Sequence, residues 1–156
     1  MLKLCDARFP RDRAEVSRLF RQYAESLSFD LCFQDFDREL ATLPGDYAAP
    51  AGCVLLAHVG QTPAGCVALR PLAANKAMCE MKRLYVMPDH RGRGAGRLLV
   101  QAVVARAVDM GYKSMRLDTI ADMHAAIALY KALGFREIAP YRHNPVPDAV
   151  YMERRL

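Results

Sequence analysis

The hydrophobic positions of the chain follow two periods, and each period predicts a different kind of element. From Val16 to Leu27 the apolar residues return every three or four positions, which is typical of a helix with one buried face. Asp12 followed by Glu15 resembles a capping box at the start of that helix. Three further helices are predicted at about Phe33–Leu43, from Gly94 or Ala95 to Gly111, and at Asp122–Leu133, where Gly134 ends the last one.

Short apolar runs bounded by glycine and proline predict strands. Cys53–Val59 and Gly65–Arg70 are separated by Gly60-Gln61-Thr62-Pro63, which indicates an antiparallel hairpin, and residues 45–52 are expected to form a loop. The other predicted strands are residues 2–7, Ala77–Met87, Met115–Thr119, Phe135–Ile138 and Val150–Glu153. This order, one strand, two helices, three strands and then α-β-α-β-β, predicts a mixed α/β domain.

Length and composition favour one soluble globular domain over residues 1–156. Hydrophobic residues make up 53% and charged residues 25%, so the chain can bury a core without a metal or a disulfide. No segment resembles the about 20 apolar residues that span a bilayer, and the first six residues lack the apolar core of a secretory signal. The five cysteines form no CxxC pair and are odd in number, which predicts a reduced, cytoplasmic protein without a zinc site.

The charge distribution says more than the net charge of +5. Residues 1–48 carry seven basic and nine acidic side chains, whereas residues 82–97 carry five basic side chains against Asp89 alone. A nucleic-acid-binding protein more often spreads its positive charge along a groove, so a compact basic cluster favours a small polyanion. A solvated basic loop without a ligand is the alternative.

The segment from Leu84 to Arg97 favours the first interpretation. A predicted strand leads into a loop with Gly92, Gly94 and Gly96, and a helix follows at once. Glycines allow the backbone to approach a ligand closely, and the first N–H groups of a helix have no intrahelical acceptor. With the helix dipole and three arginines, the segment is expected to bind phosphate oxygens.

Three phosphate-binding patterns can be compared with this loop. A P-loop is excluded because Arg97-Leu98 follows Gly96 where the pattern needs Lys and then Ser or Thr. The dinucleotide pattern GxGxxG needs glycine at position 97, although Asp118 at a later strand end keeps that alternative open. The pattern R-x-x-G-x-G is filled by Arg91, Gly94 and Gly96.

This last pattern resembles the acetyl-CoA loop of the GNAT superfamily of N-acetyltransferases. The segment Ala126–Phe135 is also similar to the A-x-x-L-Y-x-x-x-G-F helix of that family, and the element order matches over essentially the whole chain. The resemblance implies a mixed, mostly antiparallel sheet of six to seven strands flanked by about four helices. It also implies acetyl-CoA as co-substrate and a possible homodimer, whereas nothing indicates a metal, nucleic acid or a membrane.

The resemblance also implies which residues bind the cofactor. Backbone groups around Val86 would bind the pantetheine arm and the acetyl carbonyl, and they could stabilise an oxyanion. The N–H groups of residues 92–97 would hold the pyrophosphate. The implied cofactor-binding residues are Leu84, Tyr85, Val86, Arg91, Gly92, Arg93, Gly94, Ala95, Gly96 and Arg97.

Two residues match positions that are catalytic in the family. Glu80 matches a general base, which N-acetylation needs because an ammonium must lose a proton before it attacks a thioester. Strand alternation predicts Glu80, Leu84 and Val86 on one face, and an ion pair of Glu80 with Lys82 or Arg70 is the alternative. Tyr130 matches the residue that protonates the leaving thiolate, although its spacing also fits a core tyrosine.

One departure from the family is Met123, which stands seven residues before this tyrosine where many members have Asn. We expect Met123 to be a packing residue, so that cofactor binding depends more on the glycine loop.

Acceptor specificity in the family depends on the N-terminal helices and on the loop between the last two strands. Phe33 and Phe36 lie among acidic residues that suit a cationic amine, or they belong to a solvated acidic helix with two core aromatics. Arg70 and Arg142 could instead bind a substrate carboxylate. In the later loop, His143 and Asn144 are further candidates, and an exposed histidine without a role is the alternative for His143.

The function that these observations predict is transfer of an acetyl group from acetyl-CoA to a primary amine of a small molecule, by direct attack in a ternary complex. A protein N-acetyltransferase and a non-catalytic CoA-binding regulatory module are the alternatives. Retention of both Glu80 and Tyr130 argues against the last, because a protein that only binds the cofactor needs neither an acid nor a base.

Overall fold

A computed structural model describes residues 1–156, except for the side chains of Cys32 and Phe33. A sheet of seven strands in the order β1-β2-β3-β4-β5-β7-β6 forms its centre. The strands are β1 (Leu2–Asp6), β2 (Cys53–Val59), β3 (Thr62–Leu72), β4 (Asn75–Val86), β5 (Ser114–Ile120), β6 (Arg136–Ile138) and β7 (Ala149–Arg155). All neighbours are antiparallel except β4 and β5, which run parallel.

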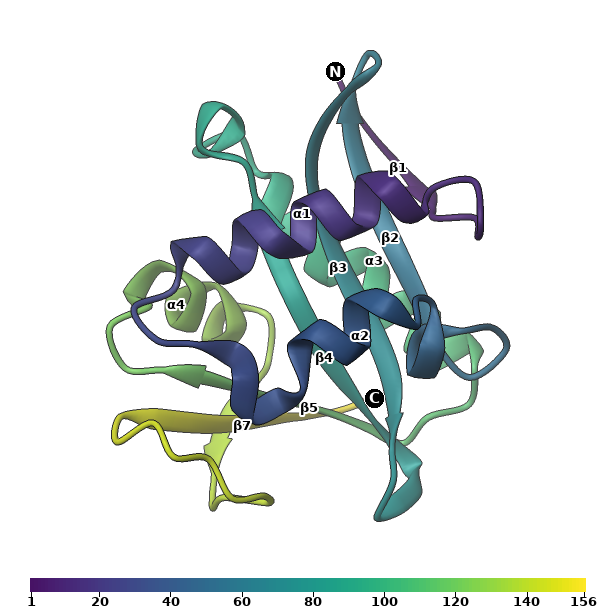
Figure 1. The fold of residues 1–156 in the computed structure, drawn as a ribbon. Helices are drawn as coiled ribbons and strands as arrows, with labels where there is room; N and C mark the ends of the chain where they lie inside the picture. The colour runs from purple at the N-terminus through teal and green to yellow at the C-terminus, as the bar shows by residue number, and fades with distance from the viewer.

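Helices cover both faces of this sheet (Figure 1). They are α1 (Arg13–Ser26), α2 (Phe36–Ala41), α3 (Ala95–Asp109) and α4 (His124–Ala132). Helices α1 and α2 lie on one face, where Val16, Leu19 and Phe20 are fully buried. Helix α3 lies on the other face and buries Leu99 and Val103 against β3 and β4. The predicted sheet of six to seven strands with about four helices is therefore confirmed.

Some local predictions are wrong, each for a physical reason. The predicted helix at Phe33–Leu43 is divided into a 3₁₀ helix (Leu31–Gln34) and α2, because Asp35 between them adopts a left-handed φ of 58°. The capping box is absent: the Asp12 carboxylate accepts a hydrogen bond from the Arg8 N–H at 2.7 Å, and Glu15 pairs with His58. Helix α4 begins at His124 instead of Asp122. Residues 45–52 include a short 3₁₀ helix (Gly45–Tyr47).

One wrong prediction concerns the site directly, namely that Glu80, Leu84 and Val86 lie on the same face of β4. Arg83 has a φ of 61°, and two residues of β4 face one residue of β3 at this point, which makes a β-bulge. Before the bulge, Cys79 and Met81 pack towards α3; after it, Leu84 and Val86 do so. Glu80 therefore lies on the opposite face of the sheet from Leu84 and Val86, because the bulge reverses the alternation.

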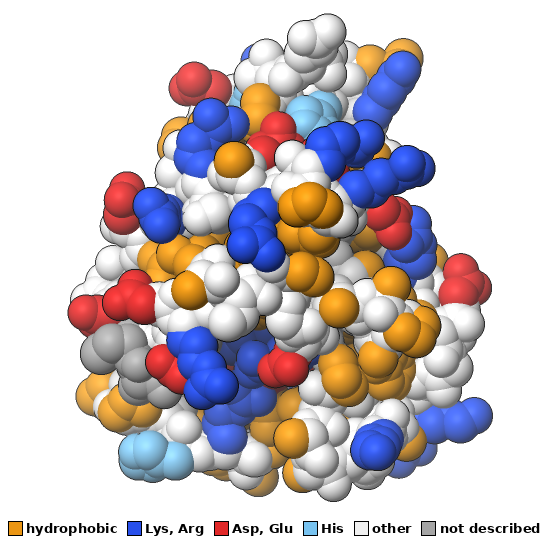
Figure 2. All heavy atoms as spheres, turned by 45° about the vertical axis from the view of Figure 1, so that its right-hand side comes forward, with side chains coloured by type: hydrophobic (Ala, Val, Ile, Leu, Met, Phe, Trp, Pro, Cys, Tyr) orange, Lys and Arg blue, Asp and Glu red, His pale blue; other side chains and the backbone are white. Residues whose placement is uncertain are grey.

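The face of the molecule drawn in Figure 2 shows Lys and Arg side chains interspersed with acidic and hydrophobic ones rather than gathered in one stripe. Among the described residues, no helix combines the length and the apolar character that crossing a bilayer requires. The four cysteines whose side chains the structure describes, at positions 5, 53, 66 and 79, are free thiols.

Candidate active site

The site lies where β4 and β5 separate. Their parallel pairing ends at Glu80 opposite Arg116, and beyond this point the two strands have no ladder between them. Two cavities occupy this region, one of about 570 Å³ and one of about 50 Å³. Tyr23, Leu84, Met123 and Ala126 line both, so the cavities adjoin.

The larger cavity is lined by the glycine loop. Gly92 and Gly94 have positive φ values of 77° and 83°, and a Cβ at either position would point into open space. Gly94 caps α3, whose first hydrogen bond runs from Leu98 N–H to Gly94 C=O. Among the described residues, no acceptor is found for the six N–H groups from Gly92 to Arg97. Consecutive free N–H groups at a helix N-terminus bind phosphate oxygens, so this loop fits the pyrophosphate of acetyl-CoA.

Most of the predicted cofactor residues line this larger cavity: Leu84, Tyr85, Val86, Arg91, Gly92, Gly94, Ala95 and Gly96. Arg93 and Arg97 do not line it and are exposed beside it. The Arg91 side chain is held in place, because its Nε donates to Val86 C=O at 3.0 Å and its guanidinium lies over Tyr85. A Cβ on Gly96 would touch Leu129 and Val86 at ordinary distances, so Gly96 is less restricted than Gly94.

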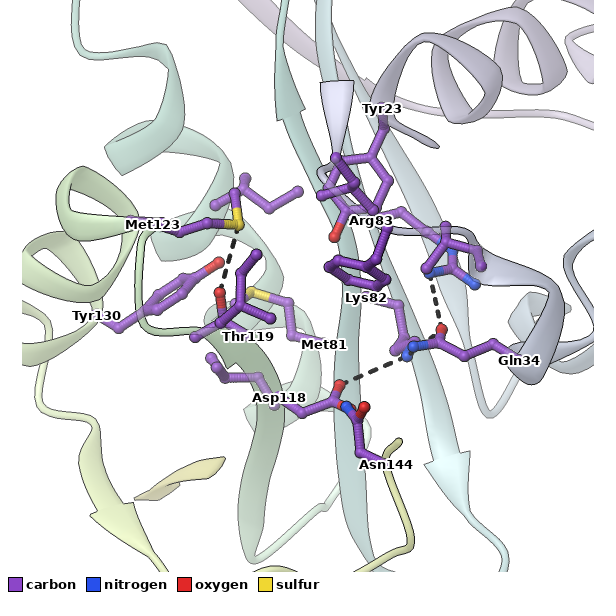
Figure 3. A pocket seen from close by; sticks show the side chains of 17 residues that line it. Tyr23, Gln34, Met81, Lys82, Arg83, Asp118, Thr119, Met123, Tyr130 and Asn144 are labelled. Atoms are coloured by element: carbon purple, nitrogen blue, oxygen red, sulfur yellow. Dashed lines mark hydrogen bonds and ion pairs between the residues drawn. The ribbon is translucent and has the colours of Figure 1, made fainter. Parts of the chain in front are cut away.

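The smaller cavity lies between α1, the 3₁₀ helix at Leu31–Gln34, β4, β5 and α4 (Figure 3). Tyr130 is 6% exposed and its hydroxyl points into the cavity beside Thr119. Burial raises the pKa of this hydroxyl. Tyr130 is therefore protonated and presents its hydroxyl to the cavity, whereas its ring packs edge-on against Phe135.

Met123 separates the two cavities. Its sulfur accepts a hydrogen bond from Thr119 Oγ1 at 3.5 Å, and its side chain lines both spaces. The residue thus contributes to the cavity walls as well as to packing.

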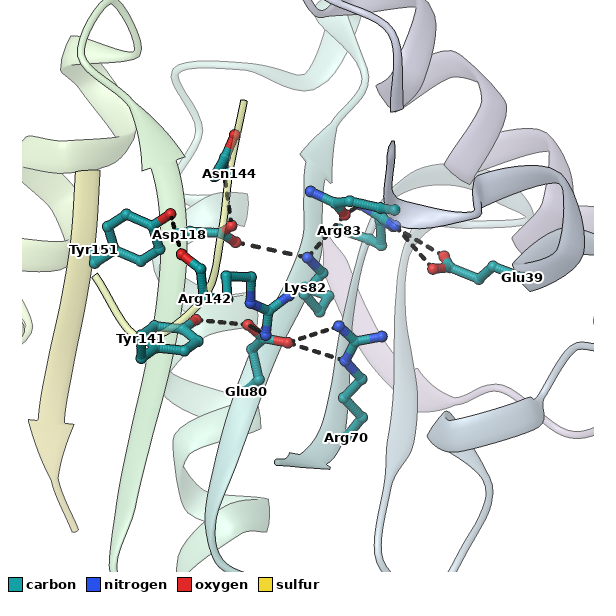
Figure 4. A network of polar contacts seen from close by, with 11 residues as sticks. Glu39, Arg70, Glu80, Lys82, Arg83, Asp118, Tyr141, Arg142, Asn144 and Tyr151 are labelled. Carbon is teal, nitrogen blue, oxygen red and sulfur yellow. Dashed lines mark hydrogen bonds and ion pairs between the residues drawn. The ribbon is translucent and has the colours of Figure 1, made fainter. Parts of the chain in front are cut away.

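Glu80 lies at the centre of a polar network next to the smaller cavity (Figure 4). Its side chain is fully buried, and Oε1 accepts from Arg70 at 2.9 Å. The other oxygen, Oε2, accepts from Tyr141 Oη at 2.6 Å and from Arg142. Burial alone would raise the pKa of Glu80, but the attraction of Lys82, Arg70 and Arg142 lowers it to about 2.

Two interpretations of Glu80 were given from the sequence, a general base and an ion pair with Lys82 or Arg70. The ion pair with Arg70, which was the alternative, is present. The base role stays a prediction, and a carboxylate with both oxygens engaged and a pKa of about 2 is a weak proton acceptor. Glu80 is not among the residues that line the smaller cavity. Through Tyr141 and Arg142 it instead anchors the loop between β6 and β7.

The candidate acceptor residues are only partly brought together. Asn144 lines the smaller cavity and donates to Asp118 at 3.3 Å. Phe36 packs in the core beneath the Arg83 guanidinium, with 5.3 Å between the guanidinium carbon and the ring centre. His143 is exposed and lines neither cavity. Phe33 lies outside the described residues. Arg70 and Arg142 are both engaged by Glu80, so neither has its guanidinium free for a substrate carboxylate.

Several residues of the site were not predicted from the sequence. Lys82 and Asp118 line the smaller cavity, and His90 and His124 line the larger one. The His90 Nδ1 atom is buried without a hydrogen-bond partner among the described residues, which fits a ligand that would supply one. Lys82 lies two residues after Glu80 on the same strand, so the alternation used for Glu80 could have identified it.

We expect the Glu80 network to make stability depend on acid pH. The folded pKa of about 2 lies below the ordinary value of 4.5, so this stabilisation is complete above about pH 4.5 and is lost as the pH falls towards 2. The loss amounts to roughly 3 kcal/mol. Urea unfolding between pH 2 and 6 measures it. Glu80→Gln should flatten the pH dependence of the free energy of unfolding, whereas Glu137→Gln at an exposed position should leave it as in the wild type. Equal pH dependence in the two variants would contradict this account.

Comparison with known proteins agrees with this geometry. Residues 14–135 match the model of the acetyltransferase (GNAT) family. An uncharacterized N-acetyltransferase of Schizosaccharomyces pombe is 40% identical over 156 residues, covering 99% of this chain and 95% of its own length. A GNAT acetyltransferase from Staphylococcus aureus has the same fold, with a TM-score of 0.81 at 20% identity and 99% of both chains covered.

A second similar structure is that of an acetyltransferase from Salmonella typhimurium with its cofactor acetyl-CoA. Its TM-score is 0.72 at 20% identity, and the match covers 99% of this chain and 93% of the other. The chain belongs to the GNAT family, as its glycine loop and its Ala126–Phe135 helix predicted. It is an acyltransferase of the N-acetyltransferase class, whose members use acetyl-CoA.

Proposed function

We propose that this protein transfers the acetyl group of acetyl-CoA to a primary amine of a small molecule by direct attack in a ternary complex. The observation that carries the proposal is the pair of adjoining cavities where β4 and β5 separate. One is wide and bordered by free N–H groups, and the other is narrow and contains the Tyr130 hydroxyl. Two neighbouring sites allow both substrates to be bound together, which direct transfer requires.

The size of the smaller cavity supports a small acceptor. It measures about 50 Å³ and is enclosed by α1, the strands and the β6–β7 loop, so an extended peptide would meet the walls on several sides. The names of other relatives point to different acceptors: one is a [ribosomal protein bS18]-alanine N-acetyltransferase and another an N-acetylaspartate synthetase. These match less than half of this chain, so they do not decide the acceptor.

The chain's own residues have separate roles in this reaction. Acetyl-CoA supplies the thioester, and the N–H groups of residues 92–97 would bind its pyrophosphate. The attacking amine must lose a proton as its C–N bond forms and the C–S bond breaks. Tyr130 is placed to donate its hydroxyl proton to the departing thiolate. The proton of the amine would pass to the carboxylate of Asp118, which is the sole acidic side chain among the described residues that line the smaller cavity.

The experiment that tests the proposal is acetyl-CoA turnover against a panel of amines, polyamines, amino acids and peptides, followed by Tyr130→Phe. The variant should lower kcat at least ~10-fold while the melting temperature and the affinity for acetyl-CoA stay nearly unchanged, because phenylalanine keeps the ring and its packing against Phe135. Tyr112→Phe, which removes a hydroxyl bonded to Ala51 C=O away from both cavities, is the matched control.

Two results would contradict the proposal. Binding of acetyl-CoA without turnover of any amine would favour the regulatory module, and turnover of peptides alone would favour a protein acceptor. Equal kcat for the wild type and Tyr130→Phe, where chemistry limits the rate, would remove the acid role.

A further inference from the structure

A loose ion pair lies in the smaller cavity. Lys82 Nζ, on β4, and Asp118 Oδ1, on β5, are 3.6 Å apart, which exceeds the range of an N–H···O hydrogen bond. Both side chains are almost completely buried, at 4% and 5% exposure, and both line the cavity (Figure 3). Charges so deeply buried are normally paired at hydrogen-bonding distance.

Neither group has its bonding capacity filled by the protein. Lys82 donates to Gln34 Oε1 at 2.9 Å, and two of its three protons have no hydrogen-bond acceptor among the described residues. The Asp118 carboxylate accepts one long bond, 3.3 Å from Asn144 Nδ2. By contrast, the neighbouring Arg83 holds both oxygens of Glu39 at 2.8 and 2.9 Å. Of these two neighbouring ion pairs, only the one that faces the cavity therefore has unused bonding capacity.

The charges around this cavity do not balance. Four cations, Arg70, Lys82, Arg83 and Arg142, are arranged against three carboxylates, Glu39, Glu80 and Asp118 (Figure 4). Arg83 is paired with Glu39, and Arg70 and Arg142 share Glu80, so Lys82 has only the loose contact with Asp118 as its ion pair. Burial lowers the pKa of Lys82 to about 8, against the attraction of Asp118 and Glu80, and the side chain stays mostly charged at pH 7.

We propose that the acceptor is a zwitterion of the α-amino acid class, whose carboxylate binds Lys82 and whose amine binds Asp118. This inference rests on the proposed function and names the substrate class of the same site. An amine without a carboxylate would satisfy Asp118 and leave Lys82 unpaired. In an α-amino acid the two charges are separated by a single carbon, so they can engage both members of a pair 3.6 Å apart.

The remaining walls of the cavity, which measures about 50 Å³, suit an amino acid with a small side chain. Leu27, Leu117 and Ile120 provide apolar contacts for a side chain, and Asn144 offers an amide beside Asp118. Arg70 and Arg142 are not needed for the carboxylate, because Glu80 already engages both.

The test compares matched acceptors with the same side chain. Each of the twenty L-amino acids is assayed with its α-carboxamide, and, where stable, with the amine that lacks the carboxyl group. The carboxamide has the less basic amine and is therefore intrinsically more reactive at neutral pH. A preference for the acid reports recognition of the carboxylate. We expect at least one amino acid to exceed its amide and its amine in kcat/KM by about 30-fold or more, the loss usual for an unpaired buried charge.

Lys82→Met then identifies the group responsible. This variant keeps the length of the side chain without its charge, and it should reduce the ratio of acid to amide turnover at least about 10-fold. Lys76→Met, at the exposed start of the same strand, should leave the ratio and the basal activity unchanged. If Lys82→Met does not fold, as judged by thermal unfolding, the wild-type acid-to-amide ratio decides alone.

The outcomes separate this inference from the proposed function. If amides or simple amines are acetylated as well as the acids for every side chain, the zwitterion proposal is wrong while the small-molecule acetyltransferase stands. If the acids are preferred but Lys82→Met keeps the ratio, the carboxylate is bound elsewhere and the proposal fails. If no amine of any class is acetylated, both fail.

Discussion

Acetyl-CoA at about 100 times its dissociation constant is expected to raise the free energy of unfolding of the wild type by about 2.7 kcal/mol, and Gly94→Val is expected to abolish this gain. Gly94 has a φ of 83° and its Cβ position points into open space at the border of the larger cavity. A valine there is strained and would place methyl groups where the pyrophosphate is expected to approach the N–H groups. Thermal and urea unfolding with and without acetyl-CoA measure the effect.

Gly60→Val is the matched control for this prediction. Gly60 also has a positive φ, 61°, and open space around its Cβ position, but it lies in the turn between β2 and β3. Both variants should lose similar stability without ligand, because the backbone strain is of the same kind. Only Gly94→Val should lose the response to acetyl-CoA; a normal response in that variant would overturn the assignment of the loop.

Glu80→Gln is expected to lower kcat/KM about 100-fold through the position of the β6–β7 loop. The change removes the charge that engages Arg70 and Arg142, and a displacement of about 1 Å in a neighbouring group is enough for a loss of this size. The loop carries Asn144, which contacts Asp118 in the smaller cavity. Because Glu80 already has a pKa of about 2, the pH dependence of kcat/KM near neutrality should stay unchanged.

A second variant separates this anchoring role from the base role that the family resemblance implies. Arg142→Met removes an anchor of the same loop and keeps the Glu80 carboxylate. If Glu80 positions the loop, both variants should lower kcat/KM with the same pH profile. If Glu80 is the base, Glu80→Gln alone should move the optimum to higher pH, because the amine must then arrive deprotonated.

The glycine loop and most elements could be predicted from the sequence because their signals are local. Three glycines between a strand and a helix limit the backbone to a few conformations, and the apolar period of α1 needs no knowledge of distant residues. Asp35 gave no comparable signal, since neither glycine nor proline marks the break before α2.

The bulge at Arg83 could not be predicted for a different reason. An arginine with a positive φ is costly by itself, of order 1–3 kcal/mol, and it persists only where tertiary contacts hold it. Those contacts come from Glu39, Gln34 and the ring of Phe36, which are more than forty residues away in sequence. The Lys82–Asp118 pair was missed on similar grounds, because only the parallel pairing of β4 with β5 brings these residues together.

The bulge also turns the side chains of β4 before and after Arg83 to opposite faces of the sheet. Glu80 and Lys82 lie on one face of the sheet and Leu84 and Val86 on the other, because Arg83 is the extra residue between the two sets. Lys82 lines the smaller cavity, Val86 lines the larger one and Leu84 lines both. If the proposed function holds, a change at position 82 would alter which amine is accepted without touching the larger cavity. This separation allows acceptor specificity to diverge in evolution while the thioester remains the same. A deletion of Arg83 would remove the bulge and still leave the two sets on opposite faces, because Leu84 would then follow Lys82 directly in the ordinary alternation of a strand.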